Sequence, residues 1–308
     1  MEIVRVDSIE YGKSFPTPYH IFNSVSFSEL NKDKCLDLHY LQFVDKKIRF
    51  GIILGEREKE LKSPFSAPFG GFSFVRNERI EYVEQAVSQL KKYGETIGKE
   101  ISISLPPFIY DSSFVSKCVS AFLRQGASIK YVDLNFQFDT DRFAHYDAFI
   151  DRSARKNLHN SLKHDFQFIQ LNSKRDEDVL RAYSVIKYNR ESKGFPLRMP
   201  LQAVLDTVKI IPADFFVLSY GSVDVAAAQV FHVAPKIAQI IYWGDVVEYS
   251  DLRVMNYFTY RVFEYYYNHG ITILDIGPST EFGIPNYGLC EFKENIGCSV
   301  SLKYTFGL

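Results

Sequence analysis

The hydrophobic positions change period several times along the first half of the chain, and each change predicts a different element. From Leu38 to Gly55 two apolar runs flank the charged turn Asp45-Lys46-Lys47, which predicts a β-hairpin. Between residues 78 and 92 apolar side chains recur at helical spacing with charges between them, which predicts an amphipathic helix. The alternating segment 100–105 ends at two prolines and predicts a strand, after which a helix and a further strand are predicted up to residue 136.

The second half begins with a basic amphipathic segment. Residues 153–166 place Leu158, Leu162 and Phe166 on one side of a predicted helix and basic side chains on the other. Further helices are predicted over 176–189 and 201–208, and strands over 215–219, 226–233 and 238–243. A long aromatic helix capped by Ser250 comes next, and the near-continuous apolar run 271–276 after it is typical of a buried central strand.

A repeated order of elements favours two related domains. Residues 91–107 and 265–279 each read as a helix end, a glycine, an apolar strand and a proline, and each follows a predicted hairpin. The alternative is accidental likeness, because hairpin–helix–strand units are common. A length of 308 residues also suggests two domains. We place the boundary in the polar segment around residues 138–146, which predicts domains 1–145 and 146–308.

Composition excludes several classes of protein. The formal net charge is −1, so no global field draws the chain to DNA or to an anionic membrane. The four scattered cysteines do not predict a disulfide framework, and no Cys/His cluster predicts a metal site. The N-terminus lacks the apolar core of a signal peptide, and no apolar run is long enough to span a bilayer. We therefore expect a cytoplasmic protein without metal or membrane span.

Three segments carry a resemblance to a known family. They are the basic helix SARKNLHNSLKHDF (153–166), the helix and strand DLRVMNYFTYRVFEYYYNHGITILDIGPST (251–280), and GLCEFKENIGCSVSLKYTF (288–306), in which Phe292-Lys293 is followed by Gly297. The chain resembles the GNAT-fold acyltransferases, and within them the branch of the Fem-type aminoacyl transferases. The N-terminal half is similar through the repeat and through SPFSAPFGGF (63–72).

The resemblance implies a mixed α/β fold with tandem GNAT-like domains. It also implies an N-acyltransferase that moves an acetyl or aminoacyl group to an amine on a sugar or a cell-envelope precursor. The donor would be acetyl-CoA or another acyl donor, with aminoacyl-tRNA possible. The segment WGDVVEYSDLRV (243–254) departs from the glycine-rich pyrophosphate turn of GNAT enzymes and carries Glu248 and Asp251. Two alternatives therefore stay open: a tRNA-dependent Fem-type ligase, and a binding or accessory protein without catalysis.

Three residues are the candidates for catalysis. Lys293 would lie beside the end of the central strand, where its charge could stabilise an oxyanion or a phosphate; the alternative is a solvated lysine. Asp275 lies inside the apolar strand, where a carboxylate must be paired or have a raised pKa, and could orient the acceptor amine or act as base. Tyr287 could protonate the leaving group.

Other residues are candidates for substrate binding. Tyr242 and Trp243 end a strand near the expected gap and could stack on a substrate, unless they are core aromatics. Asn286 precedes the final helix and could instead be its cap. Gly70 and Gly71 would let a ligand approach the backbone, unless they only form a tight turn at a domain corner. Arg155 and Lys156 of the basic helix would contact phosphates, unless they lie on a solvated face.

Overall fold

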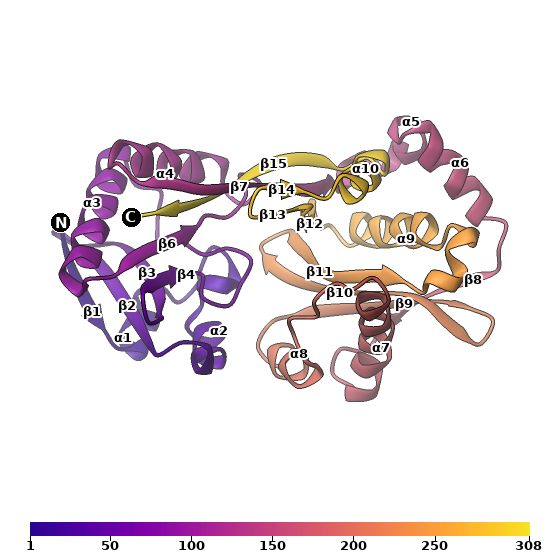
Figure 1. The fold of residues 1–308 in the computed structure, drawn as a ribbon, viewed down its shortest axis with the longest axis horizontal. Coiled ribbons are helices and arrows are strands. Elements are labelled where there is room, and N and C mark those ends of the chain that lie inside the picture. Colours follow the sequence, from indigo (N-terminus) through magenta and orange to yellow (C-terminus); the bar gives the residue numbers. More distant parts are fainter. The chain divides into compact units, whose positions relative to one another are not determined.

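The computed structural model describes all residues 1–308 and divides into two compact units (Figure 1). Unit 1 contains Met1–Leu134, Thr280–Ile284 and Ser301–Leu308, and unit 2 contains Asn135–Ser279 and Pro285–Val300. Each unit has a mixed sheet with helices packed on it, which confirms the predicted α/β class and the tandem arrangement.

Unit 1 is built around a sheet of order β1-β2-β3-β4-β6-β15, with the short β5 paired to β3. The predicted hairpin is the antiparallel pair β2–β3, and β4 runs parallel to β6. Its elements are β1 (Glu2–Val6), α1 (Ser8–Ser14), α2 (Val25–Leu30), β2 (Asp37–Val44), β3 (Ile48–Glu56), β4 (Glu60–Ser63), β5 (Ser73–Phe74), α3 (Ile80–Ile97), β6 (Glu100–Ser104) and α4 (Ser112–Arg124).

Unit 2 is built around a sheet of order β7-β12-β11-β10-β9-β8. Its helices and strands are α5 (Tyr146–Phe149), α6 (Arg152–Ser161), β8 (Phe166–Leu171), α7 (Asp176–Ser192), α8 (Leu201–Thr207), β9 (Ala213–Tyr220), β10 (Val223–Ala234), β11 (Ile237–Asp245), α9 (Val254–Asn268), β12 (Ile273–Pro278) and α10 (Tyr287–Asn295). The 3-10 helices η3 (Thr140–His145) and η4 (Val247–Leu252) precede α5 and α9.

The two units repeat the same order of elements. In unit 1 an antiparallel run β1 to β4 is followed by α3, the parallel strand β6 and α4; in unit 2 an antiparallel run β8 to β11 is followed by α9, the parallel strand β12 and α10. The helix–glycine–strand likeness in the sequence therefore reflects the structural repeat.

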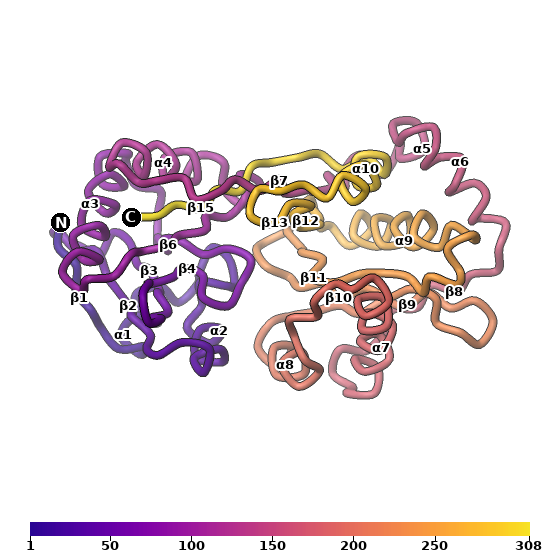
Figure 2. The backbone as a smooth tube through the Cα atoms, in the orientation of Figure 1, coloured from indigo at the N-terminus to yellow at the C-terminus, as the bar shows by residue number.

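The last strand of each repeat is exchanged between the two sheets. β7 (Ser128–Asp139) follows α4 but pairs with β12 of unit 2, while β15 (Ser299–Gly307) follows α10 but pairs with β6 of unit 1. The backbone trace shows the chain leaving unit 1 along β7 and returning along β15 (Figure 2). The two compact units divide between residues 134 and 135, with residues 280–284 and 301–308 also in unit 1, whereas the predicted domain boundary lies between residues 145 and 146.

Both faces of each sheet are buried by helices. In unit 1, α3 and α4 cover a core that includes Phe72, Phe122 and Phe306. In unit 2, Phe215 and Val217 of β9 face α7 and α8, whereas Phe216 between them contacts Tyr265 and Tyr266 of α9. This alternation along one strand explains why the buried strands read as continuous apolar runs.

Two predicted helices differ from the observed ones. The basic helix ends at Ser161, and Phe166 is the first residue of β8, where it pairs with Tyr220. Helix α9 begins at Val254 after Arg253, whose φ of 58° is left-handed, and Ser250 lies in η4 rather than at the cap. Helical spacing of apolar residues continued through both turns, so periodicity alone could not place these ends.

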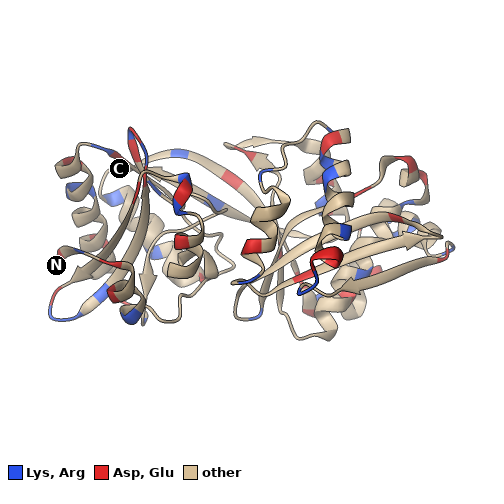
Figure 3. Cartoon of the chain, turned by 90° about the horizontal axis from the view of Figure 1, so that it is seen from below, with Lys and Arg blue, Asp and Glu red and all other residues tan.

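Charges of both signs are interspersed along the elements of each unit, in line with the net charge of −1 (Figure 3). None of the helices combines the length and the apolar character that crossing a membrane requires.

Candidate active site

In unit 2 the parallel strands β11 and β12 pair only briefly and then stop pairing. Their register runs from Ile237–Ile273 to Gln239–Asp275 and ends there. Just beyond, the pairing of β10 with β11 shifts register between Gln229 and Val230, which leaves Ile241 as an extra residue in β11. A bulge re-aims the strand that contains it. We call the unpaired ends of the two strands, residues 240–245 and 276–278, the strand split.

Lys293 lies at the strand split, buried to 2% exposure on α10. Its Nζ donates to the carbonyl oxygens of Ile276 at 3.1 Å, Gly277 at 2.9 Å and Pro278 at 3.2 Å. Burial lowers the pKa of Lys293 to about 8, although the nearby Cys298 and Asp275 oppose the change. The sequence placed this lysine beside the end of the central strand correctly; what it did not show is the burial.

Asp275 is fully buried in β12 and is held by amide groups. Its carboxylate accepts hydrogen bonds from Asn135 Nδ2 at 2.8 Å, Gln239 Nε2 at 2.9 Å and the backbone N–H of Gly277 at 2.8 Å. These donors come from β7, β11 and β12 itself. The carboxylate therefore fixes three neighbouring strands where the split begins.

Tyr242 and Trp243 follow the bulge and point to opposite faces of the sheet. Tyr242 packs against the core beneath α7 and α8, and burial raises its pKa. Trp243 meets Phe292 of α10 in an edge-to-face contact with ring centroids 6.3 Å apart. Both are partly buried. The predicted pair thus lines the split from two sides rather than forming one stacking surface.

Arg190 of α7 is a charged residue of this site that the sequence analysis missed. Its guanidinium lies over the ring of Tyr242, 5.1 Å from the centroid, and burial lowers its pKa. It also acts on Lys293, whose pKa it helps to lower. A single arginine near a helix end gives no signal in the sequence, because only the packing of α7 over β11 places it here.

Asn286 and Tyr287 differ in exposure at the start of α10. Asn286 Oδ1 accepts from the backbone N–H of Leu289 at 3.1 Å, which is the helix-cap geometry. Tyr287 is 80% exposed. The amide has a structural task, and the phenol is accessible to a ligand.

Gly70 and Gly71 lie in unit 1, where their own chain approaches them closely. A Cβ on Gly70 would lie 2.6 Å from Ser63 Oγ and 2.9 Å from the backbone N of Pro64, and Gly71 has a φ of +94°. The Gly71 N–H donates to Ser63 Oγ at 2.9 Å, and its carbonyl accepts from Asn23. These contacts account for both glycines without a ligand.

Arg155 and Lys156 are adjacent on α6 but differ in their surroundings. Arg155 Nη2 donates to the carbonyls of Ala148 and Ile150, both at 3.3 Å, and the residue lines a surface hollow of about 630 Å³. Aromatic side chains, including Phe143 and Tyr260, form part of its wall. Lys156 is exposed. Arg155 thus binds its own backbone, and Lys156 is the part of the basic stripe that is open to solvent.

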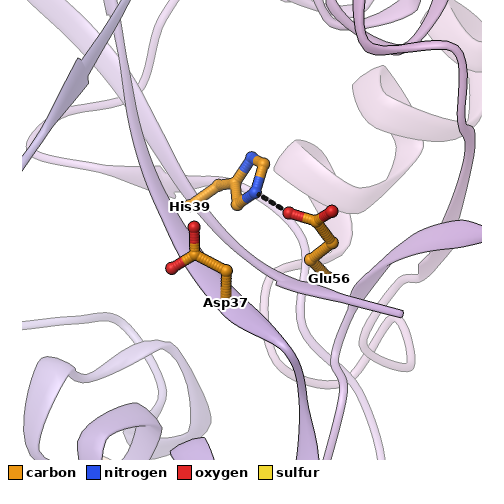
Figure 4. Close-up of side chains that lie close together, drawn as sticks. All are labelled: Asp37, His39 and Glu56. Carbon is orange, nitrogen blue, oxygen red and sulfur yellow. Dashed lines mark hydrogen bonds and ion pairs between the residues drawn. The ribbon is translucent and has the colours of Figure 1, made fainter. Parts of the chain in front are cut away.

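One group of metal-ligand type occurs in unit 1, formed by Asp37, His39 and Glu56 (Figure 4). His39 Nε2 lies 2.7 Å from Glu56 Oε2, but Glu56 Oε1 is 2.6 Å from Lys99 Nζ. Asp37 Oδ2 likewise accepts from Arg5 at 2.6 Å. Because lysine and arginine already neutralise both carboxylates, we assign this group to a network of ion pairs.

Known structures share this fold over nearly the whole chain. FemX covers 100% of this chain and 97% of its own length, with a TM-score of 0.70 at 12% identity. The C-terminal domain of a putative lysylphosphatidylglycerol synthetase from Agrobacterium fabrum covers 97% and 91%, with a TM-score of 0.62 at 11% identity. A tandem GNAT protein from the clavulanic acid biosynthesis pathway covers 99% and 97%, with a TM-score of 0.54 at 9% identity.

These likenesses show the fold, which is the GNAT-like fold of the Fem type. No protein-family model matches the sequence, and a search of curated proteins finds no match either.

Proposed function

We propose that this protein is an acyl or aminoacyl transferase that forms an amide on an amine acceptor at the strand split of unit 2. The observation that carries the proposal is Lys293, a buried lysine with a lowered pKa fixed where two parallel strands stop pairing. Unpaired strand ends offer backbone N–H and C=O groups to a ligand. The fold shared with FemX and with a tandem GNAT protein supports the same reaction class.

In the proposed reaction a neutral amine attacks the carbonyl carbon of the donor. The new C–N bond forms, the bond from the carbonyl carbon to the donor oxygen or sulfur breaks, and the amine proton passes to the leaving group. Lys293 acts through its charge, since its three N–H donors are engaged by backbone carbonyls. A positive charge in a buried site stabilises the developing oxyanion strongly. Exposed Tyr287 is the proposed relay for this proton: it donates its own proton to the leaving group and takes up the one that the amine loses.

Asp275 has a positioning role in this proposal. Its oxygens accept from three amide groups on β7, β11 and β12, so it holds the backbone of the split rather than a substrate amine. Its negative charge also favours the protonated form of Lys293.

The segment before α9 favours an aminoacyl donor over acetyl-CoA. In the GNAT enzymes that the chain resembles, pyrophosphate binds at the start of the helix that corresponds to α9. Here η4 carries Glu248 and Asp251, and Glu248 accepts a hydrogen bond from Tyr188. Acidic side chains at a helix start oppose the binding of phosphate there. We therefore propose aminoacyl-tRNA as donor and an amine on a sugar or cell-envelope precursor as acceptor.

The central test is transfer of a labelled amino acid from charged tRNA to a nucleotide-linked envelope precursor with a free amine. Alkaline treatment removes esters, so counts that survive it report the amide product. We expect Lys293→Met to lower the rate by about 10²- to 10³-fold, as loss of an oxyanion-stabilising group does. The exposed Lys187→Met is the matched control. Wild-type transfer by Lys293→Met, with its fold intact by circular dichroism, would refute the role of Lys293.

Thermal-shift measurements with acetyl-CoA and coenzyme A test the choice of donor. Acidic residues in η4, just before α9, predict no shift with either ligand at millimolar concentration. A clear rise in melting temperature with acetyl-CoA would replace the aminoacyl donor by an acyl-CoA donor at the same site.

A further inference from the structure

The guanidinium of Arg190 has no acidic partner in the structure. Its Nε is buried and makes no hydrogen bond, and no carboxylate lies within ion-pair distance. An arginine cannot escape the cost of burial by losing its proton. A buried charge without a partner is costly, so proteins nearly always pair it. Arg190 is only half-buried as a residue, but its guanidinium has a buried Nε without a hydrogen bond and no counter-charge from the chain.

Two acidic residues on or beside α7 pair with other groups. Asp245 Oδ1 lies 3.1 Å from Lys193 Nζ and also accepts from Asn189. Glu191, next in sequence, lies 3.8 Å from Lys187 on the exposed side of the helix. Both carboxylates thus form ion pairs with lysines rather than with Arg190.

Two aromatic rings contact Arg190, and an unpartnered amide lies on a neighbouring strand. The rings of Tyr242 and Phe195 lie 5.1 and 5.9 Å from the guanidinium carbon and hold it by cation–π contacts. In β10, Gln229 pairs in register with Tyr242; it is fully buried, and neither of its side-chain amide atoms has a hydrogen-bond partner. An unpartnered cation and an unpartnered amide therefore occur on neighbouring elements beside the strand split.

We propose that Arg190 binds an oxyanion of the substrate, a phosphate or a carboxylate, next to Tyr242. A guanidinium presents parallel N–H donors that match both groups. The binding of an oxyanion is independent of the proposed function. Only the assignment of that oxyanion to the transferase substrate rests on the proposed function. It places the anionic group on the same side of β11 as Tyr242, while Lys293 supplies its charge at the end of β12.

The test measures the melting temperature and the affinity of the whole chain with three probes at constant ionic strength. The probes are inorganic phosphate, dimethyl phosphate and acetate, with chloride as reference. We expect at least one oxyanion to stabilise the wild type above chloride. Preference for dimethyl phosphate indicates a phosphodiester, preference for inorganic phosphate a phosphomonoester, and preference for acetate a carboxylate.

Two substitutions of Arg190 and one control decide the outcome. Arg190→Gln should bind the preferred oxyanion about tenfold more weakly, as loss of one charge-assisted contact predicts. Arg190→Lys keeps the positive charge but lacks the parallel N–H donors of the guanidinium, so it should recover only part of the affinity. Arg175→Gln, an exposed arginine at the start of the same helix, should bind as the wild type does. No oxyanion response, or the same response in Arg190→Gln, would overturn the proposal.

A purely structural arginine would give a different stability result. Without added oxyanion, Arg190→Gln should melt no lower than the wild type, because it removes an unpaired, half-buried charge. A clear fall in its melting temperature would assign Arg190 to packing instead. The oxyanion response is measured without acyl transfer. Oxyanion binding at Arg190 can therefore be found even if Lys293→Met leaves the transfer rate unchanged, so each proposal can fail without the other.

Discussion

At the residue scale, burial decides what the charged side chains of unit 2 can do. Lys293 was predicted as a site residue from its place beside the end of the central strand, and Asp275 from its place inside an apolar strand. Both prove to be buried and hydrogen-bonded. Arg190 has the opposite arrangement, a half-buried guanidinium whose buried Nε has no hydrogen-bond partner. The sequence indicates that a charge lies near a core, but only the structure shows whether another group neutralises it.

The lowered pKa of Lys293 predicts a specific pH dependence of stability. Below about pH 8 the lysine is protonated in both folded and unfolded chains, so the full cost of burying its charge is present. Between about pH 8 and its ordinary value of 10.5 only the unfolded chain binds the proton, so stability rises with pH. Relative to Lys293→Met, the wild type should gain about 3 kcal/mol across this range.

Urea unfolding of the wild type and Lys293→Met at pH 7 and pH 10 measures this gain. Comparing the difference between the two proteins at each pH cancels the titration of all other groups. A difference that stays constant with pH would mean that Lys293 titrates near its ordinary value.

At the scale of elements, close contacts between segments explain residues that the sequence marked for other reasons. Gly70 lies against Ser63 and Pro64, so the absence of a side chain serves packing. The strand split likewise depends on two neighbours of β11, since the bulge forms against β10 and the pairing ends against β12. An apolar run in the sequence predicts a strand, but it does not show where that strand stops pairing with its neighbours in the sheet.

The packing explanation of Gly70 predicts that Gly70→Ala destabilises unit 1. The added Cβ would lie 2.9 Å from the backbone N of Pro64, which cannot move as a side chain can. Overpacking of this kind costs about 1–3 kcal/mol. In the control Gly12→Ala, the Cβ would meet only Val25 at 3.7 Å within a helix, so no loss is expected. Equal unfolding free energies for the two variants, measured in urea, would contradict the packing explanation.

At the scale of the whole molecule, the exchange of final strands makes the end of the chain part of the core of unit 1. Phe306 of β15 is fully buried and stacks on Phe122 of α4 with ring centroids 5.0 Å apart. The backbones of Leu308 and Ile101 exchange hydrogen bonds of 2.9 and 3.0 Å. The sequence repeat predicted two related units correctly, but it could not show which unit receives each final strand.

The exchange predicts that Phe306→Ala destabilises unit 1. Removing a buried phenylalanine costs about 3–5 kcal/mol. Amide hydrogen exchange of Ile101 and Ile103 in β6, the strand that pairs with β15, should become faster accordingly. Leu302→Ala, on the same strand but 38% exposed, is the control and should change these rates little. Unchanged protection of β6 in Phe306→Ala would show that β15 is not part of the cooperative core.

The sequence by itself determined the element order and the repeat, because hydrophobic periodicity and glycine–proline punctuation are local properties of the chain. The expectation of a tandem GNAT-like fold came from the resemblance of three segments to a known family. It also pointed to Asp275, which stands among apolar neighbours, and to Lys293, which follows the central strand in the final predicted helix. Only the tertiary structure decided the exchange of β7 and β15, the strand split and the unpartnered Arg190. Each of these depends on which distant segment a residue meets, and pairing across the sheets is a property of the folded chain.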